Sequence, residues 1–317
     1  MNFLINLVLV VVGFVLLIKG ADYFVEGASK IADKLGIPQL VIGLTIVAFG
    51  TSAPEAAISI SSAIKGNTGI AIGNIIGSNI MNILLILGIT SCITVLKVAK
   101  STVYYEIPFV IFITTVLVVI GGTQGKLGFI SGIILWALFI LFFVYLIKMA
   151  KSGKSDGIVE EGEAYDGKKD SMIKLIFITL AGMAAIVIGS DLTVDGATEI
   201  AKILGISDRI IGLTIVAFGT SLPELITSVT AGIKGKADIA IGNIVGSNIF
   251  NILFVLGTTS LIKSVPYSTN FVIDGIVAIA AAVLLFLGVV RKKQLGRMAG
   301  IIMLIAYAGY FAYLIVG

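Results

Sequence analysis

Histidine is absent from the 317-residue sequence, and cysteine occurs once, at Cys92. The missing histidine excludes a Ser–His nucleophile pair and imidazole metal ligands, and the single cysteine excludes a disulfide framework. Charged residues make up only 13% of the chain, where an ordinary soluble domain carries about 25%. Hydrophobic residues make up 58%. These values predict a polytopic membrane protein rather than a soluble enzyme or a disordered chain.

Apolar runs long enough to cross a bilayer, about 20 residues each, predict ten transmembrane helices. The runs cover residues 2–28, 39–64, 69–95, 102–121, 127–149, 172–198, 208–233, 238–263, 270–290 and 297–316. The fold class that we expect is therefore an all-α membrane protein.

Lysine and arginine are unequally divided between the two sets of loops. The loops after the odd-numbered spans, with their flanks, hold 16 of the 22 basic residues, and the other side holds 5. By the positive-inside rule the first set is cytoplasmic, so both termini are expected outside the cell, in a multi-pass protein of the plasma membrane. The net charge of +4 is thus explained by topology, and no nucleic-acid partner is expected.

Two segments of the sequence repeat each other. Residues 41–91 and 210–260 align without gaps at an offset of 169, with 34 of 51 positions identical. We expect a first five-helix repeat over 1–150, an acidic cytoplasmic linker over 151–170, and a second five-helix repeat over 171–317. Because five is odd, the second repeat should have inverted topology. Such a pair of repeats surrounds a pseudo-two-fold axis, with a binding site near the middle of the membrane.

Of the 18 acidic residues, only Glu55 and Glu224 lie near the centre of a predicted span. An ionised carboxylate at that depth is costly unless it is paired, solvated or protonated. No lysine or arginine lies at comparable depth, so a cation from solution is the expected partner. The bland alternative is a pair of protonated glutamates that act as hydrogen-bond donors between helices.

Each of these glutamates ends a repeated motif, GTSAPE at 50–55 and GTSLPE at 219–224. The proline before each glutamate has no N–H, so it frees the carbonyl four residues earlier, at Gly50 or Gly219. A free carbonyl at membrane depth is tolerated only where it faces a cavity or other protein groups. We therefore expect both carbonyls to serve as oxygen ligands.

The next span of each repeat carries amide and hydroxyl side chains, GNIIGSNIMN at 73–82 and GNIVGSNIFN at 242–251. Asn74, Ser78 and Asn82 follow one another at four-residue steps, which is one stripe of a helix. All these candidate ligands are oxygens, which suit hard cations such as Ca²⁺ and Na⁺. No residue is expected to be catalytic, and the protein is not expected to be an enzyme.

The duplicated GTS-x-PE followed by GN-x-x-GSN-x-x-N resembles the alpha-repeats of the sodium/calcium exchanger family, within the cation/calcium exchanger superfamily. The chain is most similar to the compact prokaryotic type. The resemblance implies secondary antiport of Na⁺ against Ca²⁺ by alternating access. It implies no cofactor beyond the transiently bound ions. The ion-binding residues that it implies are Glu55, Glu224, Thr51, Ser52, Thr220, Ser221, Ser78, Asn82, Ser247, Asn251, Ala48 and Ala217.

The sequence departs from some relatives at one position. Potassium-dependent exchangers have an aspartate where this chain has Asn251, which argues against K⁺ co-transport. An H⁺/Ca²⁺ exchanger is the alternative function, and a cation channel is a further one. Channels usually assemble a ring of subunits, whereas one chain supplies a complete two-fold site here. The expected partners are Na⁺, Ca²⁺ and the lipid bilayer, and the chain is expected to work as a monomer.

Overall fold

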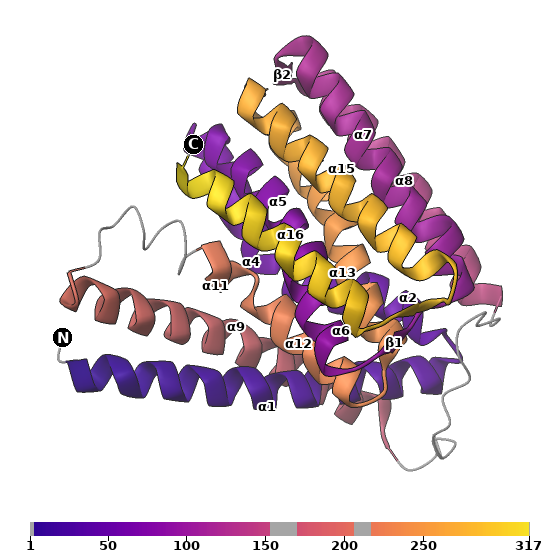
Figure 1. Ribbon diagram of the computed structural model, residues 1–317. Helices are drawn as coiled ribbons and strands as arrows, with labels where there is room; N and C mark the ends of the chain where they lie inside the picture. The colour runs from indigo at the N-terminus through magenta and orange to yellow at the C-terminus, as the bar shows by residue number, and fades with distance from the viewer. Residues whose placement is uncertain (1–2, 153–169, 206–216, 317) are drawn as a thin grey trace.

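The structure is a computed structural model that describes residues 3–152, 170–205 and 217–316 (Figure 1). Most of the expected linker, 151–170, lies outside this part of the chain. The elements are α1 (Phe3–Leu35), α2 (Gln39–Ile42), η1 (Gly43–Val47), α3 (Ala48–Thr51), α4 (Ala53–Ile64), α5 (Thr68–Met81), η2 (Asn82–Leu87), α6 (Gly88–Ile93), β1 (Leu96–Lys97), η3 (Thr102–Glu106), α7 (Ile107–Gln124), β2 (Lys126–Leu127), α8 (Phe129–Ser152), α9 (Met172–Ile203), α11 (Ala217–Thr220), α12 (Leu222–Ile233), α13 (Ala237–Phe250), η5 (Asn251–Leu256), α14 (Gly257–Ile262), β3 (Val265–Pro266), α15 (Thr269–Val290), β4 (Gln294–Leu295) and α16 (Arg297–Val316).

The described chain is all-helical apart from four two-residue strands. Eight of its helices are long and apolar enough to cross a membrane, and the bent pair Gln39–Thr51 and Ala53–Ile64 makes a ninth candidate. The expected span 208–233 begins within 206–216, outside the described residues, and its described part consists of α11 and α12. Helix α1 continues to Leu35, beyond the expected end at 28, and stops at Gly36, which has a positive φ of 64°.

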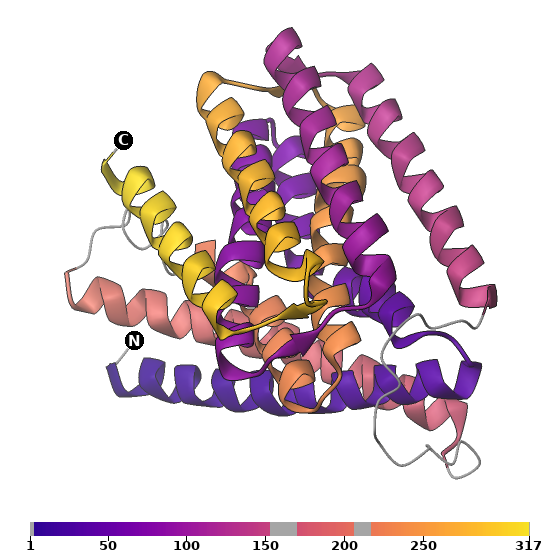
Figure 2. The same ribbon diagram turned by 45° about the vertical axis from the view of Figure 1, so that its right-hand side comes forward.

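Helices α1 and α9 lie side by side and cross the remaining helices at a steep angle (Figures 1 and 2). They are antiparallel, because Gly20 faces Gly182 while Gly13 faces Gly189. A Cβ added at Gly182 would lie 2.6 Å from the amide nitrogen of Phe24. Only glycine allows two helix backbones to come this close. The glycines of α1 and α9 recur at seven-residue spacing and so form one contact seam.

The centre of the molecule consists of the spans Thr68–Ile93 and Ala237–Ile262, whose most apolar 18-residue stretches are 72% and 94% buried. Helix α13 packs against η1 with almost no side chain between the backbones. A Cβ added at Gly246 would lie 2.8 Å from the Cα of Leu44. The polar stripes of the sequence are therefore carried by the most buried spans, which places them inside the protein and away from lipid.

Two small sheets lie at opposite ends of the bundle (Figure 1). Strand β1 pairs with β4 in one sheet, and β2 pairs with β3 in the other, both antiparallel. In each sheet, one strand comes from before the linker and its partner from after it. The two parts of the chain are thus joined by backbone hydrogen bonds at both ends of the bundle.

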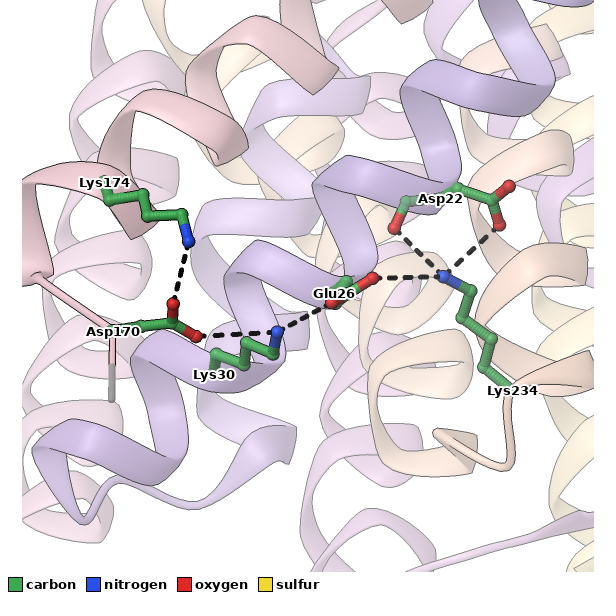
Figure 3. Close-up of polar contacts among 6 residues, drawn as sticks. All are labelled: Asp22, Glu26, Lys30, Asp170, Lys174 and Lys234. Carbon is green, nitrogen blue, oxygen red and sulfur yellow. Dashed lines mark hydrogen bonds and ion pairs between the residues drawn. The ribbon is translucent and has the colours of Figure 1, made fainter. Parts of the chain in front are cut away.

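Lysines connect α1 both to the start of α9 and to the turn between α12 and α13 (Figure 3). The Lys30 ammonium lies 2.7 Å from the carboxylate of Glu26 and 3.7 Å from that of Asp170. The Lys234 ammonium lies 3.3 Å from the carboxylate of Asp22 and 3.9 Å from that of Glu26. Lys234 therefore links α1 to the helices α12 and α13, in addition to the contact of α1 with α9 along the glycine seam.

Candidate cation-binding site

The two GTS-x-PE motifs each form a break in a helix. In the first, α3 ends at Thr51, Ser52 has non-helical dihedral angles (φ −83°, ψ 6°), and α4 begins with a bend of 51°. Pro54 stands in the first turn of α4, where its missing N–H removes no helical hydrogen bond. Ser221 occupies the same position before α12, with φ −94° and ψ 4°. The proline thus restarts each helix immediately before the glutamate.

Each break places a glutamate in the first turn of a new helix, Glu55 in α4 and Glu224 in α12. The N-terminus of a helix carries a partial positive charge, which favours a carboxylate there. Both side chains are fully enclosed, at 1% and 0% exposure. Among the described residues, the ion pairs involve neither glutamate. Helix dipoles and hydrogen bonds are thus the protein's own means of stabilising negative charge at this position.

The serine that precedes each new helix contacts the glutamate of the other repeat. Neither Ser52 nor Ser221 caps its own helix. Instead, the Ser52 hydroxyl donates to Oε1 of Glu224 at 2.8 Å, and the Ser221 hydroxyl donates to Oε1 of Glu55 at 3.3 Å. The second oxygen of each carboxylate, Oε2, is buried and has no hydrogen-bond partner. Each glutamate therefore keeps one oxygen that a cation could bind.

Further oxygens surround the first glutamate's helix break. The carbonyl of Ala48 accepts hydrogen bonds from the hydroxyls of Thr51, at 3.3 Å, and Ser247, at 3.4 Å. The Thr51 hydroxyl also donates to Oδ1 of Asn243 on α13, at 2.9 Å. The structure thus brings Ala48, Thr51 and Ser247, three of the predicted ligands, together across the two repeats.

The side-chain oxygens of two asparagines also lack partners. Oδ1 of Asn82 and Oδ1 of Asn251 are buried and accept no hydrogen bond. Both residues are the first of a π-helical turn, in η2 and η5, a feature often found at functional sites. Unlike the carboxylates, these amides can contribute oxygen to a cation without contributing charge.

The remaining predicted ligands include Ser78, Thr220 and Ala217. Ser78 is buried on α5, and Thr220 is half-buried at the end of α11. Ala217 is the first residue of α11, and its side chain lies outside the described residues. The expected free carbonyl of Gly219 accepts a hydrogen bond from Ser190 on α9 at 2.8 Å. A hydroxyl thus occupies that carbonyl in this conformation.

Several polar residues at the site were not among the predicted ligands. The Asn74 amide donates to the Ser59 hydroxyl at 3.1 Å and to the Glu55 carbonyl at 3.4 Å. In the second repeat, Asn243 makes the same two contacts, at 2.9 Å to Ser228 and 3.4 Å to the carbonyl of Glu224. In the sequence, the repetition of Asn74 as Asn243 at an offset of 169 is the feature that could have identified them. These asparagines hold each glutamate-bearing helix against the following span.

A third buried acid lies away from this site. Glu106, at the end of η3, has 0% exposure and accepts a hydrogen bond from the hydroxyl of Tyr145 on α8. It lies close to the start of its span, so the expectation that only Glu55 and Glu224 are near span centres is unaffected. Among the described residues, no serine donates to Glu106 in the way that Ser52 and Ser221 donate to the central glutamates.

Comparisons with known proteins match nearly the whole chain. The sequence profile of the family described as "Sodium/calcium exchanger protein" matches residues 5–148 and again residues 174–316. The sodium/calcium exchanger MaX1 of Methanosarcina acetivorans is 32% identical over 346 residues, covering 98% of both proteins. The inner membrane protein YrbG of Escherichia coli is 35% identical over 310 residues, covering 93% of this chain and 92% of its own.

Solved structures agree with the sequence matches. A structure of the sodium-calcium exchanger NCX_Mj superposes with a TM-score of 0.84 at 34% sequence identity, covering 98% of this chain and 99% of that one. The helix arrangement described above is therefore shared with that exchanger over its full length.

Proposed function

The chain belongs to the sodium/calcium exchanger protein family, and on that premise we propose that it exchanges Na⁺ for Ca²⁺ across the membrane by alternating access. It is a multi-pass integral membrane transporter and not an enzyme. One observation carries the proposal. Glu55 and Glu224 are buried, each accepts a hydrogen bond from the other repeat, and each has one oxygen without a partner.

The proposed ligand set is made of hard oxygens. Calcium in proteins takes about 6–8 oxygens at roughly 2.3–2.6 Å in flexible geometry. The two central carboxylates supply the charge. The neutral oxygens of the set are Thr51, Ser52, Ser78, Asn82, Thr220, Ser221, Ser247 and Asn251, with the carbonyls of Ala48 and Ala217. Two negative charges balance one Ca²⁺ or two Na⁺, and the shared oxygens make the two ions compete.

Competition between the two ions produces exchange if the site can switch from one side of the membrane to the other only when ions are bound. Two unpaired carboxylates in the interior are costly, so the empty site resists enclosure away from water. A bound cation removes that cost and allows the loaded protein to move between its two open forms. Calcium can then leave on one side only when sodium takes its place for the return.

We further propose ten spans in two inverted halves, 1–150 and 171–317, joined by a cytoplasmic linker. The sequence repeat supports this arrangement, as do the paired contacts of Ser52 with Glu224 and of Ser221 with Glu55. The family match supports a protein of the plasma membrane, and the unequal distribution of lysine and arginine supports an orientation with both termini extracellular. Because one chain supplies both glutamates, a monomer is sufficient for transport.

The decisive experiment uses proteoliposomes loaded with Na⁺ and diluted into Na⁺-free buffer that contains radioactive calcium. We expect calcium uptake that requires the outward sodium gradient and persists when a protonophore collapses any pH gradient. Uptake driven only by a pH gradient would replace this function with H⁺/Ca²⁺ exchange. Calcium flux without any counter-ion would indicate a channel. Vesicles that contain the Glu55→Gln variant provide the matched background.

A further inference from the structure

A circuit of hydrogen bonds between two asparagines, extended by one further asparagine on each side, joins the two central spans. The Asn79 side-chain amide donates to the main-chain carbonyl of Asn248 at 3.2 Å, and the Asn248 amide donates to the carbonyl of Asn79 at 3.1 Å. The exchange is reciprocal, and the two residues are 169 positions apart. Both side chains are buried, at 3% and 1% exposure. This contact joins α5 to α13 inside the protein.

The same two residues also receive hydrogen bonds. The Asn82 amide nitrogen donates to Oδ1 of Asn248 at 3.0 Å, and the Asn251 amide nitrogen donates to Oδ1 of Asn79 at 3.2 Å. Asn82 and Asn251 are likewise buried, at 1% and 0% exposure. Every nitrogen of the circuit therefore has a protein acceptor, while two oxygens, Oδ1 of Asn82 and Oδ1 of Asn251, have no donor.

These hydrogen bonds determine where the NH₂ group and the oxygen of each side-chain amide point. A main-chain carbonyl can only accept a hydrogen bond, so Asn79 and Asn248 must turn their NH₂ groups toward it. Their Oδ1 atoms then face Asn251 and Asn82 and can themselves only accept. Asn251 and Asn82 must consequently present NH₂ to the circuit. The orientation that is usually ambiguous for an amide is determined here by two carbonyls.

We propose that Asn79 and Asn248 are positioning residues that hold the oxygens of Asn251 and Asn82, respectively, toward the transported cations. The proposal rests on the function proposed above, in which Asn82 and Asn251 are neutral ion ligands. An asparagine that turned its NH₂ toward a cation would repel it. Groups that orient a metal ligand typically change metal affinity by about 10–100-fold when they are removed.

The test compares Asn79→Leu with wild type, measuring the sodium concentration at half-maximal thermal stabilisation of the purified full chain. We expect that midpoint to rise about tenfold, because the Asn251 amide is then free to turn. Asn248→Leu should act in the same way through Asn82. A midpoint within twofold of wild type for both variants would overturn the proposal.

A double-mutant cycle separates positioning from packing. In an Asn251→Asp background, either orientation of the side chain presents an oxygen. Adding Asn79→Leu should therefore change the sodium midpoint by less than about twofold, in contrast to its effect in the wild-type background. An equal rise in both backgrounds would show that Asn79 only packs the two spans together, and the proposal would fail.

A conservative variant covers the case in which Asn79→Leu does not fold. Asn79→Asp keeps the acceptor for the Asn251 amide, loses the donor to the Asn248 carbonyl and adds a carboxyl group. Its sodium midpoint should not rise above that of wild type, because the Asn251 amide keeps its acceptor and an added negative charge can only favour a cation. A tenfold rise would count against positioning. Because stabilisation is measured without transport, wild-type protein that binds Na⁺ but shows no sodium-driven calcium uptake would refute the proposed function and leave the positioning test intact.

Discussion

The Ser52 hydroxyl donates to the Glu224 carboxylate at 2.8 Å although the two residues lie 172 positions apart in the chain. The equivalent bond from Ser221 to Glu55 is longer, at 3.3 Å. Each carboxylate of the site therefore depends on a donor from the opposite repeat. A substitution of the serine in one motif should therefore affect the glutamate of the other motif.

Replacing either glutamate by glutamine should abolish exchange. Glu55→Gln or Glu224→Gln removes one of two buried negative charges while keeping nearly the same shape, so folding should survive and calcium uptake should fall to background. Sodium-driven uptake in proteoliposomes, with gel filtration for folding, measures both effects. Glu199→Gln on the exposed face of α9 is the control, since Glu199 pairs with Lys202 outside the site. Near-normal uptake in either glutamine variant would remove these residues from the site.

Ser52→Ala should weaken calcium binding by about tenfold, equivalent to about 1.4 kcal/mol. The alanine removes a candidate ligand and leaves Oε1 of Glu224 without its donor. Ser221→Ala should have a smaller effect, because its bond to Glu55 is longer. Isothermal titration with Ca²⁺ gives the affinities, and Ser152→Ala at the end of α8 serves as the control. Equal and unchanged affinities would show that the two hydroxyls do not contribute.

The glycine seam between α1 and α9 should not tolerate a methyl group. In Gly182→Ala the new Cβ would lie 2.6 Å from the amide nitrogen of Phe24, and overpacking of this kind costs about 1–3 kcal/mol. We expect a lower thermal unfolding midpoint. The matched control is Gly309→Ala in α16, where an added Cβ meets nothing within 4 Å among the described residues. Equal midpoints for the two variants would show that the seam can open.

Lys234→Gln should change stability only slightly. Its ion pairs with Asp22 and Glu26 are partly exposed, and such pairs contribute about 1 kcal/mol or less. The difference from wild type should shrink further in high salt, which screens exposed charges. Thermal midpoints at two ionic strengths test this, with Lys151→Gln at the end of α8 as the control. A loss of stability that persists in high salt would require a contact other than these ion pairs.

Calcium uptake should not depend on potassium. Asn251 supplies an amide where an aspartate would add a charge, so the site has no extra negative group to balance a further cation. Replacing K⁺ by choline on both sides of the membrane should leave sodium-driven uptake unchanged. Uptake that stops without K⁺ would show that another oxygen set holds the additional ion.

The repeated motifs pointed to the centre of the candidate site because their chemistry is local. Glu55 and Glu224 stand out as carboxylates deep in apolar spans, and the structure encloses both. The serines next to them were predicted as ligands, but their crossed partners were not. Which glutamate a serine contacts depends on how the two repeats pack, and an offset in sequence does not specify that.

Asn79 and Asn248 were missed for a different reason. The stripe of Asn74, Ser78 and Asn82 runs at four-residue steps, and Asn79 lies one residue off it. That face of the helix meets α13, so its role is apparent only from the tertiary contact. The π-helical turns at Asn82 and Asn251 could not be predicted from the sequence either, because no residue pattern distinguishes them from an ordinary α-helix. The inverted arrangement of the two halves stays a prediction.

The two small sheets have a consequence for the integrity of the chain. Because β1 pairs with β4 and β2 pairs with β3, cleavage of the peptide between 153 and 169 would release neither piece. We expect the two fragments to stay associated through these strand pairs at both ends of the bundle and through the glycine seam of α1 and α9. A tag or sensor module inserted there should therefore leave the fold intact.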